Sequence, residues 1–300
     1  MGCAIETDQR VRNKLKLNRV LMRILKSLTI AALIFAFFPF TSSAQIRNDN
    51  VFDDLPEHLL YQVKQLDQFI ARFNSNENAE GIRINATQAS QEDREKILAS
   101  LFDLEMLNQP DFKAKAIRFI DEVAGSKIQN LSFYDNNFFA TINCKVLYKN
   151  KREQLTLTLV VEGNPSNGSH WGIKGARANF LEETKQHKSK ANIIPPTNHE
   201  VEFIALLDIF NEKKDLNNYI SGGNSTNQLN QLNEVLKSGN LKMLSTSPPT
   251  YHFLQVPGWL FTVDYFNRSS NNSGLLISDL QRAGQPEINK YKTEKLFILQ

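Results

Sequence analysis

The alternation of residue types between Ala140 and Gly163 constrains the fold of this 300-residue chain more than any other stretch. Apolar and polar residues alternate from Ala140 to Tyr148, and again from Leu155 to Val161. We expect the turn between the two runs at Lys149-Asn150-Lys151-Arg152. Alternation with a period of two over this length is typical of antiparallel strands that place one face on a core. The stretch therefore predicts one long β-hairpin.

A fainter copy of this pattern lies between Phe261 and Gly284. The run Phe261-Thr262-Val263-Asp264 resembles Ala140-Thr141-Ile142-Asn143, and Gly284 corresponds to Gly163, both at an offset of 121 residues (261 − 140 = 121). In each half, helical patterns precede strand patterns, which indicates a repeated unit. We therefore predict an α+β fold of two modules, each with N-terminal helices followed by a curved, cone-like antiparallel sheet.

The first 44 residues have the layout of an export signal. They hold seven basic side chains and two acids, followed by an apolar run from Leu28 to Phe40 and small residues at Ser42-Ser43-Ala44. The apolar run is shorter than the roughly 20 residues that a membrane span needs. We predict a signal peptide over residues 1–44, cleaved after Ala44. Met22 is an alternative start, and an uncleaved membrane anchor is the alternative fate of the leader.

Charge and cysteine content bear on partners and location. Without the leader the chain has 28 basic and 30 acidic residues (35 − 7 and 32 − 2), so no excess of positive charge predicts a nucleic-acid partner. Cys3 lies in the leader and Cys144 is then alone, which excludes an intrachain disulfide. An exported protein without disulfides fits the periplasm or cell surface of a Gram-negative bacterium.

The predicted domains are divided by a polar segment. We assign residues 45–181 to the first module and residues 197–300 to a second, smaller module. Between them, residues 182–196 lack apolar periodicity and end in Pro195-Pro196, as linkers do.

Helices are expected at Glu57–Asn74, after the capping pair Ser90 and Asp93, from Pro110, and near residues 200–210, 215–220 and 229–237. Strands are expected at residues 128–134, 138–148, 155–161, 170–180, 241–245, 251–256, 259–266, 275–280 and 291–299.

This order resembles the nuclear-transport-factor-2-like fold, in which a cone-shaped sheet wraps a long first helix. Glu57–Asn74, with His58-Leu59-Leu60-Tyr61-Gln62-Val63, corresponds to the long helix, and His170-Trp171-Gly172-Ile173-Lys174 looks like the aromatic last strand. The chain also resembles exported proteins of Bacteroidetes-type bacteria with such domains. The resemblance implies the cone-like fold, but that fold hosts isomerases, dehydratases, transport factors and secretion-system parts, so it does not imply one activity.

An isomerase of this fold would need a carboxylate or histidine inside the cone. Tyr61, Asp103, Asp121 and His170 are the available groups, and their spacing matches no isomerase motif. Tyr61 also fits the core, Asp121 a solvated helix flank, and His170 the end of a strand. We retain Tyr61, Asp121, His170 and the adjacent Trp171 as candidate ligand-binding residues.

The sequence favours neither a catalytic residue nor a metal or cofactor. The five histidines lack metal-site spacing, and no Gly-x-Ser-x-Gly elbow is present. Ser221-Gly222-Gly223 lacks the Lys-Ser/Thr that a phosphate-binding loop requires. Cys144 falls in the apolar set of its alternation, which predicts a buried, unreactive thiol.

Aromatic residues crowd one predicted hairpin, at Trp259, Phe261, Tyr265 and Phe266. They form either the core of the second module or an exposed patch for a partner. We predict a non-catalytic exported protein that acts by binding or assembly, with a protein, peptide or small molecule as partner. The alternatives are a small-molecule enzyme or lipophilic-ligand carrier that uses the first cone, and a membrane-anchored secretion or conjugation component. Membrane contact is expected only if the leader stays uncleaved.

Overall fold

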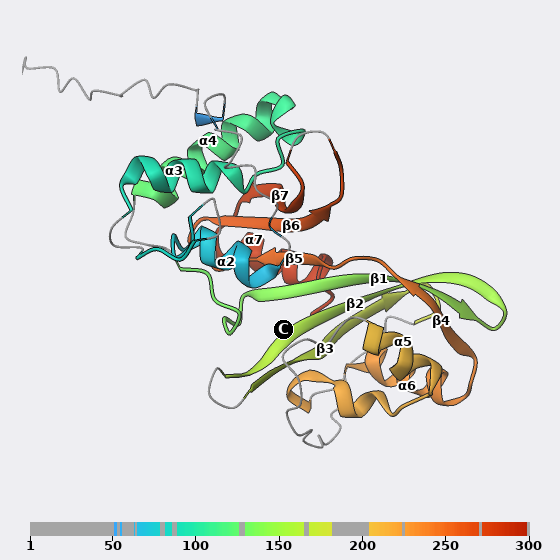
Figure 1. Ribbon diagram of the computed structural model, residues 1–300. Coiled ribbons are helices and arrows are strands. Elements are labelled where there is room, and N and C mark those ends of the chain that lie inside the picture. The colour runs from blue at the N-terminus through green and yellow to red at the C-terminus, as the bar shows by residue number, and fades with distance from the viewer. Residues whose placement is uncertain are drawn as a thin grey trace, which may run out of the picture. The chain divides into compact units, whose positions relative to one another are not determined.

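The computed structural model describes residues 51–52, 55, 63, 65–78, 82–85, 89–125, 130–164, 168–181, 204–223, 226–269 and 272–298 (Figure 1). The predicted signal peptide, the linker at residues 182–196 and the candidate residue Tyr61 lie outside these ranges.

The described residues form an α+β fold with six α-helices and one seven-stranded antiparallel sheet, which confirms the predicted fold class. The strands are β1 (Phe138–Tyr148), β2 (Lys151–Asn164), β3 (Gly168–Ala178), β4 (Leu241–Thr246), β5 (Thr250–Phe253), β6 (Trp259–Phe266) and β7 (Gly274–Arg282). Their order across the sheet is β3-β2-β1-β5-β6-β7, and β4 also pairs with β1. β4 and β5 both pair with β1: β4 pairs with its C-terminal part and β5 with its N-terminal part. Pro248 and Pro249 lie between β4 and β5.

The α-helices are α2 (Leu66–Phe73), α3 (Gln91–Ser100), α4 (Pro110–Gly125), α5 (Ile204–Asn211), α6 (Asn227–Lys237) and α7 (Gln285–Glu294). Short 3-10 turns lie at η3 (Met106–Asn108), η4 (Leu216–Tyr219) and η5 (Ser221–Gly223). The predicted capping pair at the start of α3 is confirmed, because Ser90 Oγ accepts from the backbone N–H of Asp93 and the Asp93 carboxylate accepts from Ser90 N.

The predicted central hairpin is present as β1 and β2. Its register pairs Ala140 with Leu159 and Tyr148 with Lys151. The turn therefore contains only Lys149 and Asn150, at φ 45° and 65°, which is the left-handed pair that a two-residue hairpin turn requires. The four-residue turn expected from the sequence is wrong, because the strands continue pairing closer to the tip.

Helices of the first half pack against strands of the second half, and α6 of the second half packs against β3 of the first half. From the first half, Phe69 and Phe73 of α2 stack on Phe253 of β5 and Phe261 of β6, with ring centroids 5.7 and 5.8 Å apart. Phe119 of α4 meets the ring of Trp259 of β6 edge-on at 5.4 Å. These aromatic pairs bury large apolar areas that the two halves cannot bury separately.

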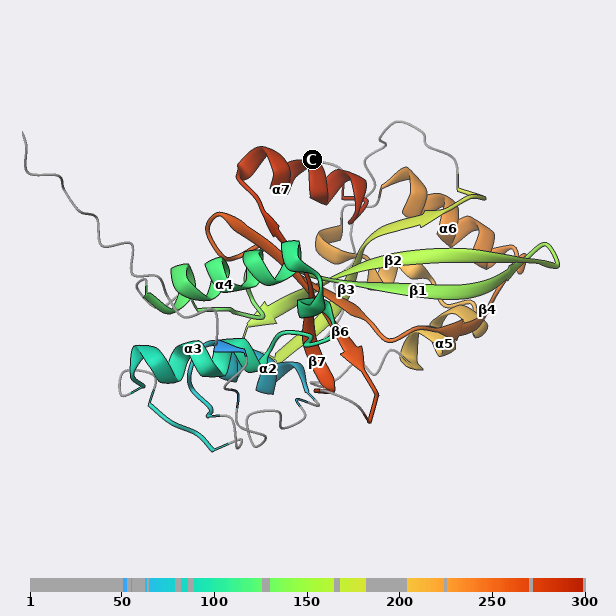
Figure 2. The ribbon, with the colours of Figure 1, turned by 90° about the horizontal axis from the view of Figure 1, so that it is seen from above.

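From the second half, α5 packs against β4, and α6 packs against β3 and β4. Both views of the ribbon show α5 and α6 beside the β1–β2 hairpin, whereas α2, α3 and α4 gather around β6 and β7 (Figures 1 and 2). One apolar cluster runs through all of these elements, and residues 49–300 form one compact unit. The predicted arrangement of two cone-like modules is therefore not confirmed, because strands of both halves join a single sheet.

Several predicted elements differ from the structure. The predicted strand at residues 251–256 ends at Phe253 in β5, and the predicted helix near residues 215–220 is the 3-10 turn η4. The predicted strand at residues 291–299 is wrong, since Gly284, Pro286 and Glu287 start helix α7 there: Glu287 accepts a hydrogen bond from Gly284 N at 2.9 Å. That capping signal was present in the sequence.

The predicted strand at residues 128–134 is wrong over its described part, because the amide side chain of Asn74 bonds both the N–H and the C=O of Leu131. The predicted helix Glu57–Asn74 is shorter, since Val63 pairs with Gly274 of β7 as a β-bridge and α2 begins at Leu66.

The second face of the sheet carries α7. A smaller apolar cluster lies beneath it, formed by Phe139, Leu254, Leu260, Ala283 and Leu296. The chain after α7 also crosses this face, because Thr158 Oγ1 of β2 donates to Leu296 O at 2.6 Å.

Candidate functional site

The predicted ligand-binding residues do not converge on one site within the described part of the chain. Asp121 is half-buried on α4, which packs on β7 at one edge of the sheet. His170 and Trp171 lie on β3, which forms the opposite edge. Tyr61 is outside the described residues, so its role stays a prediction.

The strongest concentration of chemically active groups surrounds Glu162 on β2. Its Oε1 accepts from Ser221 Oγ and from the backbone N–H of Gly222, each at 2.6 Å. Its Oε2 lies 3.3 Å from Nε2 of His170, and both side chains are 30% exposed. We call these four residues the Glu162 cluster. The cluster brings His170, a predicted site residue, close to the Ser221-Gly222-Gly223 loop, although the two lie far apart in the sequence.

The geometry of the Glu162 cluster fits a clamp better than a nucleophile. A serine nucleophile needs an adjacent base that takes its proton, usually an imidazole. Here Ser221 Oγ donates to a carboxylate instead, while His170 contacts the other oxygen of that carboxylate. Gly172 allows the loop to approach, since a Cβ there would lie 3.0 Å from Ser221 Cβ. The cluster fastens the η5 turn onto the free edge of β3.

Trp171 belongs to the core side of the sheet. Its ring lies 5.7 Å from Phe138 and 6.4 Å from Tyr251, measured between centroids. It is half-buried against the main apolar cluster. The aromatic residues Trp259, Phe261, Phe253 and Tyr251 are buried as well, whereas Tyr265 is 40% exposed. Of the hairpin residues named from the sequence, Trp259 and Phe261 therefore belong to the core, Phe266 is half-buried and Tyr265 is exposed. The core that they join is the main apolar cluster, which both halves share.

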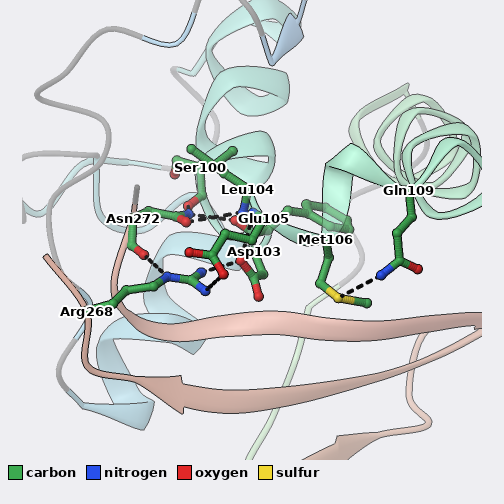
Figure 3. A network of polar contacts seen from close by, with 9 residues as sticks. Ser100, Asp103, Leu104, Glu105, Met106, Gln109, Arg268 and Asn272 are labelled. Carbon is green, nitrogen blue, oxygen red and sulfur yellow. Dashed lines mark hydrogen bonds and ion pairs between the residues drawn. The ribbon is translucent and has the colours of Figure 1, made fainter. Parts of the chain in front are cut away.

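Asp103, the other acid considered from the sequence, is buried in a network that joins the end of α3 to the β6–β7 loop (Figure 3). Its carboxylate pairs with Arg268 Nη2, and Nη1 of the same guanidinium lies 2.9 Å from Glu105. Asn272 donates to Phe102 O at 2.6 Å and accepts from Leu104 N. Arg268, Asp103 and Glu105 thus form ion pairs, and the amide of Asn272 bonds the backbone beside them.

Arg268 also donates through Nε to the backbone carbonyl of Asn272, at 2.9 Å. Figure 3 shows the carboxylates of Asp103 and Glu105 and the backbone carbonyl of Asn272 directed toward this one guanidinium, whereas the amide side chain of Asn272 points to Ser100 and Leu104. The network therefore serves to hold the loop between β6 and β7 against the segment after α3.

His252 was not singled out from the sequence, yet among the described residues it is a buried histidine whose two ring nitrogens both have hydrogen-bond partners. Its Nε2 lies 2.8 Å from Thr141 Oγ1 and its Nδ1 lies 2.8 Å from the Tyr291 hydroxyl. Burial lowers the pKa of His252 to about 3 and raises the pKa of Tyr291. The available signal was its place between Tyr251 and Phe253, which puts His252 on the α7 side of the strand.

Neutral His252 fits this site because each ring nitrogen faces a hydroxyl, which can donate or accept. The imidazole cannot reach substrate from this position, since α7 covers it. The group is a hydrogen-bonded link between β1, β5 and α7.

The described residues contain no group of three or more His, Cys, Asp or Glu side chains placed to hold a metal ion. Among those same residues, no helix is both long and apolar enough to cross a bilayer. Compared with family models, curated proteins and solved structures, the chain has no significant match.

Proposed function

We propose that this protein is a non-catalytic, exported binding or assembly protein. The observation that carries the proposal is that its carboxylate and histidine side chains bond other side chains of the same protein. Glu162 bonds Ser221, Asp103 pairs with Arg268, and His252 bonds Tyr291. Each pair joins segments distant in the sequence, so these groups stabilise the fold instead of facing a substrate.

The aromatic interior also supports a binding role on the outside of the molecule over a carrier function. Phe73, Phe102, Phe119 and Phe261 are fully buried and contact one another at ring distances between 5.6 and 6.2 Å. Side chains packed in this way fill the space that a lipophilic ligand would occupy in a cone.

The finer fold assignment belongs to the same proposal. An antiparallel sheet with most of its helices on one face is compatible with a nuclear-transport-factor-2-like origin. The offset of 121 residues makes Phe138, the first residue of β1, equivalent to Trp259, the first residue of β6, in the repeat (259 − 138 = 121). We propose that two such units fused into one sheet, with helices of the first half packed on strands of the second half. Export to the periplasm or cell surface rests on the leader at residues 1–44.

The test has two parts, and the first concerns export. The full chain is expressed in a Gram-negative host, and the exported protein is measured by intact mass. We expect a chain that begins at Gln45. A product that retains Leu28–Phe40 supports the membrane-anchored alternative instead.

The second part concerns catalysis. A strain lacking the gene is complemented with a variant in which Glu162→Gln, His170→Asn and Ser221→Ala remove the acid, base and hydroxyl of the Glu162 cluster. If the protein is non-catalytic, this variant should complement the strain as well as the wild type does when the two are present at equal levels of folded protein. Loss of function at an unchanged melting temperature would favour the enzyme alternative.

A further inference from the structure

The sheet face on which α7 lies extends beyond α7 toward the β1–β2 turn, and there it carries a group of basic side chains. Near the β1–β2 turn, Lys145 of β1, Arg152 of β2 and Lys242 of β4 point to the same side. Leu147 of β1 pairs with Arg152 on one side and with Lys242 on the other. Lys145 lies two residues before Leu147 in β1. Alternate residues of a strand share one face, so the three cations lie together. We call this surface the basic face.

The cations of the basic face are exposed and have no ion-pair partner among the described residues. The neighbouring side chains on the same face contain no acid: they are Asn143, Leu147, Gln154, Thr156, Arg177 and Ser245. Lys149 and Lys151 extend the positive charge at the turn. The result is a local excess of charge in a chain whose predicted mature form is slightly acidic.

The two sides of this part of the sheet are covered differently. The opposite side holds Ile142, Cys144 and Val146, which are buried in the main apolar cluster. In Figure 1, α5 and α6 lie below the hairpin and no labelled helix lies above its far end. Leu244, at a bulge in the β4 pairing, is 43% exposed beside the basic side chains.

We propose that the basic face docks this protein onto an anionic membrane surface. Three features favour a lipid surface over an acidic protein or a nucleic acid. The face is an open stretch of strands, its cations are spread across three of them, and an exposed leucine lies among them. A bilayer with anionic headgroups attracts such clusters without requiring a shaped partner. Nucleic acid is disfavoured by the proposed export, on which this inference rests.

This mode of contact differs from anchoring by the leader. A few basic residues bind reversibly and in a salt-dependent way, and the attraction decays within about 10 Å at 0.1 M salt. The mature protein would therefore lie on the membrane through the hairpin end, with α5 and α6 facing away from the lipid.

The experiment uses the chain from Gln45 to Gln300 and sedimentation with vesicles. One set holds equal parts of phosphatidylglycerol and phosphatidylcholine, and the other holds phosphatidylcholine alone. We expect binding to the first set only, weakened by added salt. The variant Lys145→Gln, Arg152→Gln, Lys242→Gln should bind about a hundredfold more weakly, since each basic residue near an anionic surface contributes about fivefold in affinity.

A matched variant, Lys115→Gln, Lys213→Gln, Lys295→Gln, removes the same charge from exposed positions on α4, after α5 and after α7. It should bind like the wild type. Equal weakening by both triple variants would overturn the assignment to the basic face, because only net charge would then matter. Binding of polyglutamate or DNA without binding of vesicles would overturn the membrane assignment. Neither result alters the proposed lack of catalysis, which complementation tests separately.

Discussion

The hydroxyl of Tyr291 lies 2.8 Å from Nδ1 of His252, and this contact fastens α7 to the sheet. Two further links reinforce it: Lys292 Nζ donates to Asn137 at 2.7 Å, and Thr158 donates to the backbone carbonyl of Leu296. The imidazole is buried, so its protonation state is coupled to folding.

We predict that acid destabilises the protein through His252. Its pKa is lowered to about 3 in the folded state, against about 6.5 in an unfolded chain. Between these values the unfolded chain binds a proton that the folded protein does not. The free energy of unfolding therefore falls as the pH falls below 6.5, by about 2 kcal/mol between pH 6.5 and 5.

Urea unfolding across this pH range measures the effect, with His252→Gln as the variant that lacks the titrating group. The stability advantage of the wild type over this variant should shrink as the pH falls. Tyr291→Phe serves as the control, because it removes one hydrogen bond, worth about 1 kcal/mol, but keeps the imidazole. A constant difference between wild type and His252→Gln across the range would contradict the prediction.

We predict that Cys144 is inert. Its side chain is buried on the core face of β1, and burial raises the pKa of the thiol to about 12. Because the thiolate is the reactive form, the native protein should resist a thiol reagent and the urea-unfolded protein should react at once. Cys144→Ala should cost about 1 kcal/mol or somewhat more through lost packing. Rapid labelling of the native protein would contradict burial.

Local sequence patterns predicted the bounds of two strands to the residue. The alternation from Phe138 to Tyr148 gave the bounds of β1, and the cluster at Trp259–Phe266 gave those of β6. These strands follow their own pattern because one face of each lies on the core. The prediction for residues 291–299 was wrong because their apolar residues suggested a strand, whereas the helix-start signal at Gly284–Glu287 begins helix α7.

Contacts between distant segments were not predictable from one sequence. Glu162 and Ser221 stand 59 positions apart, and Asp103 and Arg268 stand 165 apart. No local periodicity relates such residues, since the fold of the sheet brings them together. For the same reason, the packing of α2 and α4 on strands of the second half was missed: an internal repeat indicates similar units but not which helix covers which strand.

We predict that Arg268 is essential for stability because it neutralises buried Asp103. Arg268→Gln leaves a buried carboxylate without its cation, which should cost about 3–5 kcal/mol. Adding Asp103→Asn should restore part of this loss, and a double-mutant cycle in urea measures the coupling. The exposed pair of Lys96 and Glu92 is the comparison: Lys96→Gln should cost no more than about 0.5 kcal/mol. Additive costs for Asp103 and Arg268 would contradict the role of the pair.

We predict that Gly172 is required for the η5 turn to approach β3. A methyl group there would lie 3.0 Å from Ser221 Cβ and 3.1 Å from its Cα, so Gly172→Ala should cost about 1–3 kcal/mol. Gly125, at the end of α4, is the matched control, because the nearest atom to an added Cβ is Gln91 Nε2 at 3.7 Å. Gly125→Ala should be neutral or slightly stabilising. Thermal unfolding of both variants measures the difference, and equal melting temperatures would contradict close packing at Gly172.

We predict that the two halves fold only together. A fragment of residues 45–181 leaves Phe69, Phe73 and Phe119 without the strands on which they stack, and β1 without β4 and β5. A fragment of residues 197–300 leaves α6 without β3, and leaves β4 and β5 without β1. Each fragment alone should therefore lack cooperative thermal unfolding and should aggregate, because it exposes a large apolar surface.

When both fragments are expressed in one cell, they should co-purify as a 1:1 complex whose circular dichroism matches that of the intact protein. Proteolysis within residues 182–196, where we predict the linker, should likewise leave two pieces that elute together until urea is added. Cooperative folding of residues 45–181 alone would restore the interpretation of two independent modules. It would also mean that the aromatic contacts between α2 and the strands β5 and β6 contribute little to stability, which their complete burial makes unexpected.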